Sequence, residues 1–402
     1  MKKTIITSFM FGGACFGTCV GAHAQSSVTL YGIVDNGLTY LSSATSLGST
    51  SGGHSAVKMT AGVWAGSRFG LKGSEDLGGG TKTIFALEDG FNSTNGTAQY
   101  TGGIFTRQAW VGMTNDRFGT LTAGRQYTAY YNTLAPWSPT TWLTGYFGAH
   151  PGDIDSLDNI YRANNSLVYQ APTLAGFTFS ASYAFGGVPG SVDAGSTWSA
   201  GLQYQNGPIG IGAAVQRVNN STPGGGAWGV SSTTSNGGAE TAVSAINNGY
   251  QTAQAQQRVA VTGGYSFSSA LDVTASYSNV QYISGTGSAF RDTAIFNTAG
   301  AVLHFKPASA WDLAAGYSYT RATKANGIAS EAQYQQLTLS QYYALSKRTG
   351  LYAVQSYQRA NGNTLNNGKV IEATASLGDG FSGTPSSSRS QIAVGVGVVH
   401  RF

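Results

Sequence analysis

Hydrophobic and polar residues alternate one by one in short stretches along most of the chain. Val28, Leu30 and Val34 would lie on one face of a strand, whereas Tyr31 and Asp35 would lie on the other. The same alternation recurs in segments 175–183, 337–340 and 351–354. Successive side chains of a strand point to opposite faces, so this two-residue period predicts β-strands with one apolar and one polar face.

The segments that separate these stretches are of two kinds. Short connectors, rich in turn-forming residues, occupy residues 76–80, 115–119, 206–208, 268–270, 307–309 and 346–349. Long connectors, rich in Ser, Gly, Asn and Thr, occupy residues 42–60, 129–161, 219–256 and 362–388. Short turns at one end and long loops at the other are typical of transmembrane barrels, and the stretches between them number about sixteen.

A sheet of this size in a membrane must close, because hydrocarbon offers no water to the unpaired backbone groups of a sheet edge. A barrel this wide cannot be filled by its own side chains and therefore encloses water. The final stretch fits such a wall, with Ile392, Val394, Val396, Val398, His400 and Phe402 outward and Ala393, Gly395 and Gly397 inward. The sequence predicts an all-β fold, a transmembrane antiparallel β-barrel with an aqueous lumen.

The composition supports this fold and excludes others. Only 10% of the residues are charged, against roughly 25% in soluble domains. The apolar run 392–399 is short and contains two glycines, which excludes a helical membrane protein. The basic excess is small and contains no cluster of Lys or Arg, so no nucleic-acid partner is expected.

The N-terminal residues read as a targeting segment. Lys2 and Lys3 precede the uncharged stretch Thr4–Val20, and Ala22-His23-Ala24 is a small-x-small cleavage site. We expect a signal peptide at residues 1–24 and a single barrel domain at residues 25–402. An uncleaved membrane helix or a lipoprotein signal at Cys15 are the alternatives.

Both cysteines, Cys15 and Cys19, lie inside that segment. The remaining chain has no disulfide, thiol nucleophile or thiolate metal ligand, and no cofactor or metal site is expected in it. Without Lys2 and Lys3, Lys plus Arg falls from 22 to 20 against 17 acidic residues, a net charge near +3.

Several segments resemble the trimeric general porins of beta-proteobacteria, the Burkholderia, Neisseria and Comamonas group. They are Ser26–Gly32, Ser67–Gly80, Phe118–Tyr127, Asn164–Tyr169 and His400–Phe402. The resemblance implies a sixteen-stranded barrel that forms a homotrimer among the lipids and lipopolysaccharide of the outer membrane. It also implies passive diffusion of small hydrophilic solutes and ions.

The same resemblance implies a narrow point in the pore. The family's third external loop folds into the lumen, and here it would be Thr128–Tyr161, carrying Trp137, Trp142, Tyr146, Asp153, Asp155 and Asp158. Arg68, Arg162 and Glu88 stand where the family has its wall arginines and an opposing acid.

Strand parity, the rule that every second residue of a strand lies on the same face, predicts which charged side chains point inward. This prediction does not depend on the family resemblance. Phe69 and Leu71 would face lipid, so Arg68 and Lys72 would face the lumen. The same argument directs inward Lys82, Glu88, Arg162 and Asn164. For Arg68 the alternative is an ordinary solvated charge of the lumen, far from the constriction.

Arg107 and Arg125 lie on the same strand face as apolar residues at even spacing from them, so both would point outward. Either reaches the lumen only through a bulge or from a position above the membrane. A trimer contact or a snorkelling side chain at the interface is the alternative.

The inward arginines suggest a general porin with a weak to moderate anion preference, tempered by Glu88 and the three loop aspartates. A sugar- or phosphate-selective channel is the alternative function, and an adhesin role of the long loops could coexist with a pore. An outer-membrane enzyme would need a catalytic cluster, whereas His54, His150, His304 and His400 are scattered and read as loop or interface residues.

Aromatic residues spread along the strands fit the two interfacial girdles of a barrel, with a carbohydrate-stacking surface as the alternative. They are Tyr31, Phe69, Phe177, Tyr183, Trp198, Tyr265, Tyr277, Trp311, Tyr317 and Phe402.

Overall fold

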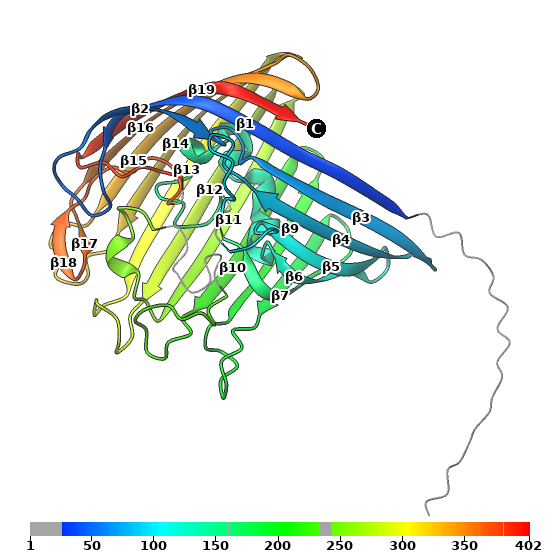
Figure 1. Cartoon of the computed structure of the whole chain (residues 1–402), viewed down its shortest axis with the longest axis horizontal. Helices are drawn as coiled ribbons and strands as arrows, with labels where there is room; N and C mark the ends of the chain where they lie inside the picture. The colour runs from blue at the N-terminus through cyan, green and yellow to red at the C-terminus, as the bar shows by residue number, and fades with distance from the viewer. Residues whose placement is uncertain (1–25, 101, 159–160, 234–242, 381) are drawn as a thin grey trace, which may run out of the picture.

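A computed structural model describes residues 26–100, 102–158, 161–233, 243–380 and 382–402. Antiparallel strands wind round a closed barrel, with the long connectors gathered at one end (Figure 1). The predicted all-β fold class is confirmed. The expected signal peptide and its two cysteines lie outside the described residues.

The barrel sheet contains seventeen stretches of strand. Two of them, β2 (His54–Ala61) and β3 (Arg68–Gly78), both pair with β1 (Ser27–Ala44) and form one strand interrupted at residues 62–67. The barrel therefore has sixteen strands, as predicted. The others are β4 (Thr81–Gly90), β5 (Gln108–Asn115), β6 (Gly119–Gln126), β7 (Ala163–Gln170), β8 (Phe177–Ala184), β9 (Thr197–Asn206), β10 (Ile209–Asn219), β11 (Ala255–Ser268), β12 (Leu271–Ile283), β13 (Ala294–Ala308), β14 (Trp311–Ala322), β15 (Gln333–Ala344), β16 (Thr349–Asn361) and β19 (Ser390–Arg401).

The barrel closes where the first and last strands meet. β1 pairs with β19 from Ile33, opposite Arg401, to Leu41, opposite Ala393. This pairing removes the two edges that an open sheet would leave in hydrocarbon, where each unpaired N–H or C=O costs several kcal/mol.

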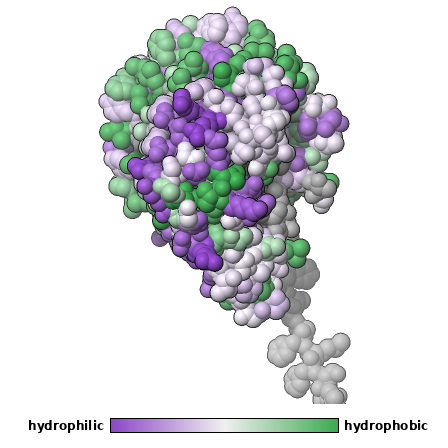
Figure 2. All heavy atoms as spheres, turned by 90° about the vertical axis from the view of Figure 1, so that its left-hand side faces the viewer, coloured by the Kyte–Doolittle hydropathy of each residue, from purple (hydrophilic) through white to green (hydrophobic). Residues whose placement is uncertain are grey.

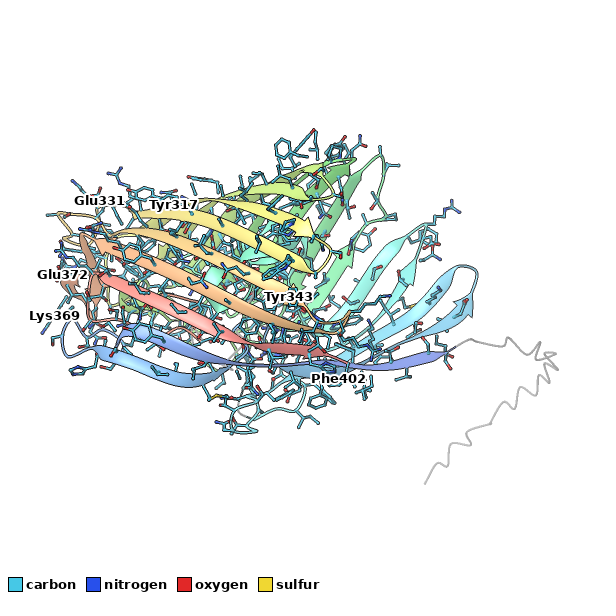
Figure 3. All side chains as sticks on the ribbon, turned by 90° about the horizontal axis from the view of Figure 1, so that it is seen from above. Tyr317, Glu331, Tyr343, Lys369, Glu372 and Phe402 are labelled. Atoms are coloured by element: carbon cyan, nitrogen blue, oxygen red, sulfur yellow. The ribbon has the colours of Figure 1, made fainter. Side chains whose placement is uncertain are left out.

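The two faces of the wall follow the alternation in the sequence. In β1, Leu30 and Leu38 are exposed on the outside, whereas Asp35 and Thr39 are fully buried on the inside. Among the predicted girdle residues, those exposed on the outer face are Phe69, Phe177, Trp198, Tyr265, Tyr277, Trp311, Tyr317 and Phe402. Tyr343 and Phe402 lie toward one end of the barrel and Tyr317 nearer the other (Figure 3).

Tyr31 is an exception to the predicted girdle. Its side chain points into the lumen, where its hydroxyl donates a hydrogen bond to Glu88. Parity already placed Tyr31 on the polar face with Asp35, so its assignment to the girdle was wrong.

Short and long connectors alternate along the chain, and one predicted long connector is shorter than expected. Residues 79–80, 207–208 and 269–270 are tight turns, and Gly78, Gly79 and Gly80 all have positive φ, which only glycine adopts without strain. The connector predicted at residues 42–60 is limited to 45–53, because β1 and β2 extend on either side of it. The connector predicted at 362–388 carries a hairpin of β17 (Asn363–Asn366) and β18 (Lys369–Glu372).

Helical segments occur only in connectors of the described chain. The loop after β6 holds α1 (Ala129–Leu134), η1 (Ala135–Trp137), α2 (Thr140–Leu143) and η2 (Tyr146–Gly148), and η3 (Asn248–Tyr250) lies in a later loop. Within the part of the chain that is described, no helix is long and apolar enough to cross a membrane. Seen from the loop end, hydrophilic residues dominate the middle of the molecule and hydrophobic residues its upper edge (Figure 2).

Candidate pore constriction

The segment between β6 and β7 turns into the barrel instead of extending from it. The N–H of Tyr130 donates to the Ser199 hydroxyl at 3.1 Å, and the Thr262 hydroxyl donates to the Leu134 carbonyl at 2.9 Å. Both wall residues point inward from their strands. We call residues 128–158 the constriction loop.

The second half of the constriction loop is bound to the wall farther round. The Thr338 and Ser356 hydroxyls both donate to the carbonyl of Phe147, at 3.2 and 3.1 Å. The Ser340 hydroxyl donates to the carbonyl of Trp142 at 3.0 Å. These bonds hold the loop across the lumen.

The carboxylate of Asp155 is part of this attachment. Asp155 accepts a hydrogen bond from the Ser278 hydroxyl at 2.7 Å and contacts His150 Nδ1 at 2.7 Å. Asp153 is also buried, and its carboxylate accepts the Asp158 N–H at 2.8 Å. Neither Asp153 nor Asp155 borders the pore cavity, so the prediction that they line the constriction is corrected.

Small wall residues allow the loop to approach closely. The Trp137 ring lies so near Gly210 that a β-carbon there would come within 1.9 Å of it. The Trp142 ring stacks on His304 at 3.7 Å between centroids. His304 itself lies inside the barrel between Asp272 and Asp312, which corrects its prediction as a loop or interface residue.

Beside the constriction loop the lumen contains a cavity of about 690 Å³. Its wall side carries four arginines, Arg68, Arg107, Arg162 and Arg401. Its loop side carries Thr140, Thr144, Gly145, Tyr146 and Asp158, and the last external connector contributes Asp379.

Glu88 lies among the arginines and pairs with two of them. Its Oε1 is 2.7 Å from Arg107 Nε, and its Oε2 is 3.9 Å from Arg68 Nε. The Tyr31 hydroxyl donates to the same Oε2 at 3.0 Å. With Arg162 and Arg401, which also border the cavity, four cations face one carboxylate, so this wall keeps an excess of three positive charges.

Tyr127, the first residue after β6, joins two of the arginines. Its hydroxyl accepts hydrogen bonds from Arg107 at 3.3 Å and from Arg162 at 3.1 Å, and the Arg162 guanidinium lies over its ring. Burial alone would raise the pKa of Tyr127, but Arg162 and Arg107 outweigh it and lower the pKa to about 8.

The pKa of Asp158, on the loop side of the cavity, is shifted in the opposite direction. Burial, followed by the nearby Asp153 and Asp379 carboxyls, raises the pKa of Asp158 well above its usual range. A protonated Asp158 carries no charge. The loop side therefore opposes the arginines less than its acidic residues suggest.

These two shifts predict that anion preference decreases as pH rises. Tyr127 loses its proton around pH 8 and adds a negative charge beside Arg107 and Arg162. Ionisation of Asp158 acts in the same direction. Reversal potentials in a salt gradient from pH 6 to 10 should therefore move toward cation selectivity.

The variant Tyr127→Phe should lose the part of this pH dependence centred near pH 8, because phenylalanine has no proton to release. Tyr169→Phe, an exposed tyrosine at the end of β7, is the matched control. A pH profile that is unchanged in Tyr127→Phe would contradict the assignment.

Arg107 and Arg125 behave differently from each other. Arg107 precedes the first residue of β5, so strand parity does not apply to it, and it points into the cavity. Arg125 lies in a bulge of β6, between paired residues Gly124 and Gln126. Its side chain donates to the Thr106 carbonyl at 2.6 Å and does not border the cavity.

The two lysines predicted at the constriction lie elsewhere. Lys72 is exposed, with its ammonium 5.3 Å from the centre of the Tyr31 ring, and Lys82 is exposed beside the tight turn at residues 79–80. Neither borders the cavity. Parity gives the side of the wall but not the height along it, so both predictions are corrected.

Sequence reasoning missed the interruption between β2 and β3. Residues 62–67 enter the lumen, with Trp64 bordering the cavity and stacking on Tyr342 and Tyr352. The Asp35 carboxylate accepts the N–H groups of Trp64 and Ala65 at 2.7 and 2.6 Å. The break in alternation at Gly62-Val63-Trp64-Ala65-Gly66 was the available sign.

Comparison with known proteins identifies the family of this barrel. A family model described as Gram-negative porin matches residues 13–363. The chain is 33% identical over 240 residues to an outer membrane porin protein of Bordetella pertussis, covering 54% of this chain and 60% of that protein. It is 31% identical over 227 residues to outer membrane porin protein 32 of Delftia acidovorans, covering 54% and 61%. The match thus spans about 60% of the length of these two relatives.

Solved structures agree in fold. The anion-selective porin from Comamonas acidovorans superposes with a TM-score of 0.68 at 24% identity, covering 94% of this chain and all of that one. OmpT of Vibrio cholerae superposes with a TM-score of 0.64 at 16% identity, covering 94% and 99%. Since the family model covers most of its length, the chain belongs to the family of Gram-negative porins.

Proposed function

We propose that this barrel is a general diffusion pore that passes small hydrophilic solutes and ions, with a weak to moderate preference for anions. Its family and fold place it in the outer membrane and indicate a channel rather than an enzyme. The observation that carries the proposal is the cavity between the constriction loop and the cluster of Arg68, Arg107 and Arg162.

A pore selects ions by the field at its narrowest point. Four guanidinium groups, of Arg68, Arg107, Arg162 and Arg401, border the cavity with one wall carboxylate, Glu88, and burial raises the pKa of the facing Asp158 well above its usual range. Anions therefore meet a lower barrier than cations of equal size. The Comamonas protein of similar fold is described as anion-selective, which supports the same sign here.

The test is the reversal potential of single channels in a planar bilayer under a salt gradient. Arg68→Ser and Arg162→Ser each remove one positive charge from the cavity, so each should move the potential toward cation selectivity, and the double variant farther. We expect a roughly two- to fivefold fall in the anion-to-cation permeability ratio of the double variant.

Lys72→Ser is the matched control, because it removes the same charge from the strand of Arg68 but outside the cavity. Glu88→Gln should act in the opposite direction. An unchanged reversal potential in the double arginine variant would refute the role of the cluster. Membrane insertion without any conductance would refute the pore.

We further propose that the chain assembles as a homotrimer. The support is the OmpT structure of similar fold, which is described as a trimer form. Conductance steps that come in threes in the same recordings would support this assembly, and uniform single steps would count against it.

A further inference from the structure

The outer face of β12, β13 and β14 carries a groove. Residues opposite one another in an antiparallel ladder lie in a row on the same face. In one row the small Ala299 lies between Tyr277 and Tyr319. Ala299 forms the floor of a groove of about 500 Å³ between Tyr277, which is half exposed, and Tyr319, which is partly buried.

One end of this groove is polar and basic. Asn297 and Arg321 form the next row toward the loops, and Lys324 follows just after β14. Glu331 pairs with both cations, yet their side chains remain 58% and 63% exposed. Glu331 lies at the loop end of the barrel, with Lys369 and Glu372 (Figure 3). One carboxylate for two cations leaves a positive charge with free donors at the groove.

Further basic residues follow along the same rim. Arg359 lies in the same row as Tyr319. Gln335 of β15 pairs with Tyr319 on one side and with Arg359 of β16 on the other. Arg389 is exposed and pairs with Glu372. The rim formed by Arg321, Lys324, Glu331, Arg359, Glu372 and Arg389 has four basic groups against two acidic ones. A net positive rim at the level of lipid headgroups attracts anionic lipids.

The groove thus joins an apolar channel facing hydrocarbon to exposed cations at its external end. An acyl chain fits the alanine floor, and a phosphate fits the free donors of Arg321 and Lys324. A second copy of the chain fits less well, because it would bury two exposed cations with only one carboxylate, and unpaired buried charges are costly.

We propose that this groove binds one acyl chain of a phosphorylated glycolipid of the outer leaflet, with its phosphate between Arg321 and Lys324. The site is separate from the pore, since its residues point outward from strands whose inward neighbours face the lumen. A variant can therefore lose lipid binding and keep conductance, or lose conductance and keep lipid binding.

Native mass spectrometry of the detergent-solubilised full chain tests the site, with lipid A carrying two phosphates and the same lipid A without phosphates as probes. The unchanged protein should retain the phosphorylated form in preference. Arg321→Ala with Lys324→Ala should weaken retention of the phosphorylated form roughly tenfold and remove the preference. Ala299→Leu should weaken retention of both forms, because it fills the floor and leaves the charges in place.

Lys347→Ala with Arg348→Ala, at the turn after β15, removes the same charge at the opposite end and should change nothing. Conductance and the heat-dependent mobility of the folded barrel on a gel show for each variant that the barrel is intact. A preference for phosphate that survives the loss of Arg321 and Lys324 would overturn the proposal. So would undiminished retention in Ala299→Leu, or a dimer of the protein that this variant dissociates.

Discussion

Replacing Trp64 by alanine should raise the single-channel conductance roughly twofold, because the indole takes up space at the edge of the pore cavity. The ring borders the pore cavity and is only 8% exposed, since it stacks on Tyr342 and Tyr352 at 5.1 and 5.5 Å. Alanine leaves that space to water and ions. The anion preference should fall slightly at the same time, since a wider pore places ions farther from the arginines.

The interruption that carries Trp64 also touches the constriction loop. A β-carbon on Gly145 would lie 1.5 Å from the carbonyl oxygen of Val63, so the backbones of the two segments are in direct contact. The constriction is therefore closed by two insertions, one from the loop and one from the wall.

Trp198→Ala is the control for the conductance experiment, because Trp198 is exposed on the outer face. Its conductance should equal that of the unchanged protein. If Trp64→Ala also leaves the conductance unchanged, the interruption does not limit the flow, and the constriction loop alone sets the pore size.

Replacing Asp35 by alanine should lower the free energy of unfolding by about 3 kcal/mol. The substitution removes a buried carboxylate and leaves its hydrogen-bond donors without an acceptor. Asp35 is fully buried, and it accepts the N–H groups of Trp64 and Ala65 and the Tyr352 hydroxyl at 2.6 Å. Urea unfolding of the barrel in lipid vesicles measures the loss.

Asp35→Asn should cost less, because the amide oxygen still accepts some of these hydrogen bonds. Asp116→Ala, at an exposed turn, should change the unfolding free energy by less than about 0.5 kcal/mol. An Asp35→Ala variant as stable as this control would show that the carboxylate does not hold the interruption in place. Noisier single-channel currents should accompany the destabilisation, because residues 62–67 lose their anchor.

Strand parity succeeded where the ladder is regular. It placed Arg68 and Glu88 inward beside the exposed Phe69, and these two side chains do meet. It failed for Arg107, which precedes the ladder of β5. Parity depends on unbroken pairing, and the sequence does not show where pairing starts or shifts.

For a different reason, the sequence did not show which aspartates of the constriction loop border the cavity and which are bound to the wall. Asp155 contacts His150 and Ser278, which are 5 and 123 residues away along the chain, whereas Asp158 borders the cavity. A loop has no fixed period, so neighbouring residues gave no sign of which side would meet the wall.

The sequence by itself determined the all-β barrel, a number of about sixteen strands and, where the pairing is regular, the lipid-facing and water-facing sides of each, because these follow from a local two-residue period and from the need to close the sheet. Only the tertiary structure decided which charges meet in the constriction. It brought Arg68, Arg107 and Arg162 together around Glu88 and Tyr127, buried Asp153 and Asp155, and directed Trp64 into the lumen. Those contacts join segments far apart in the chain, and the height of each side chain along the barrel is fixed by register and packing rather than by parity.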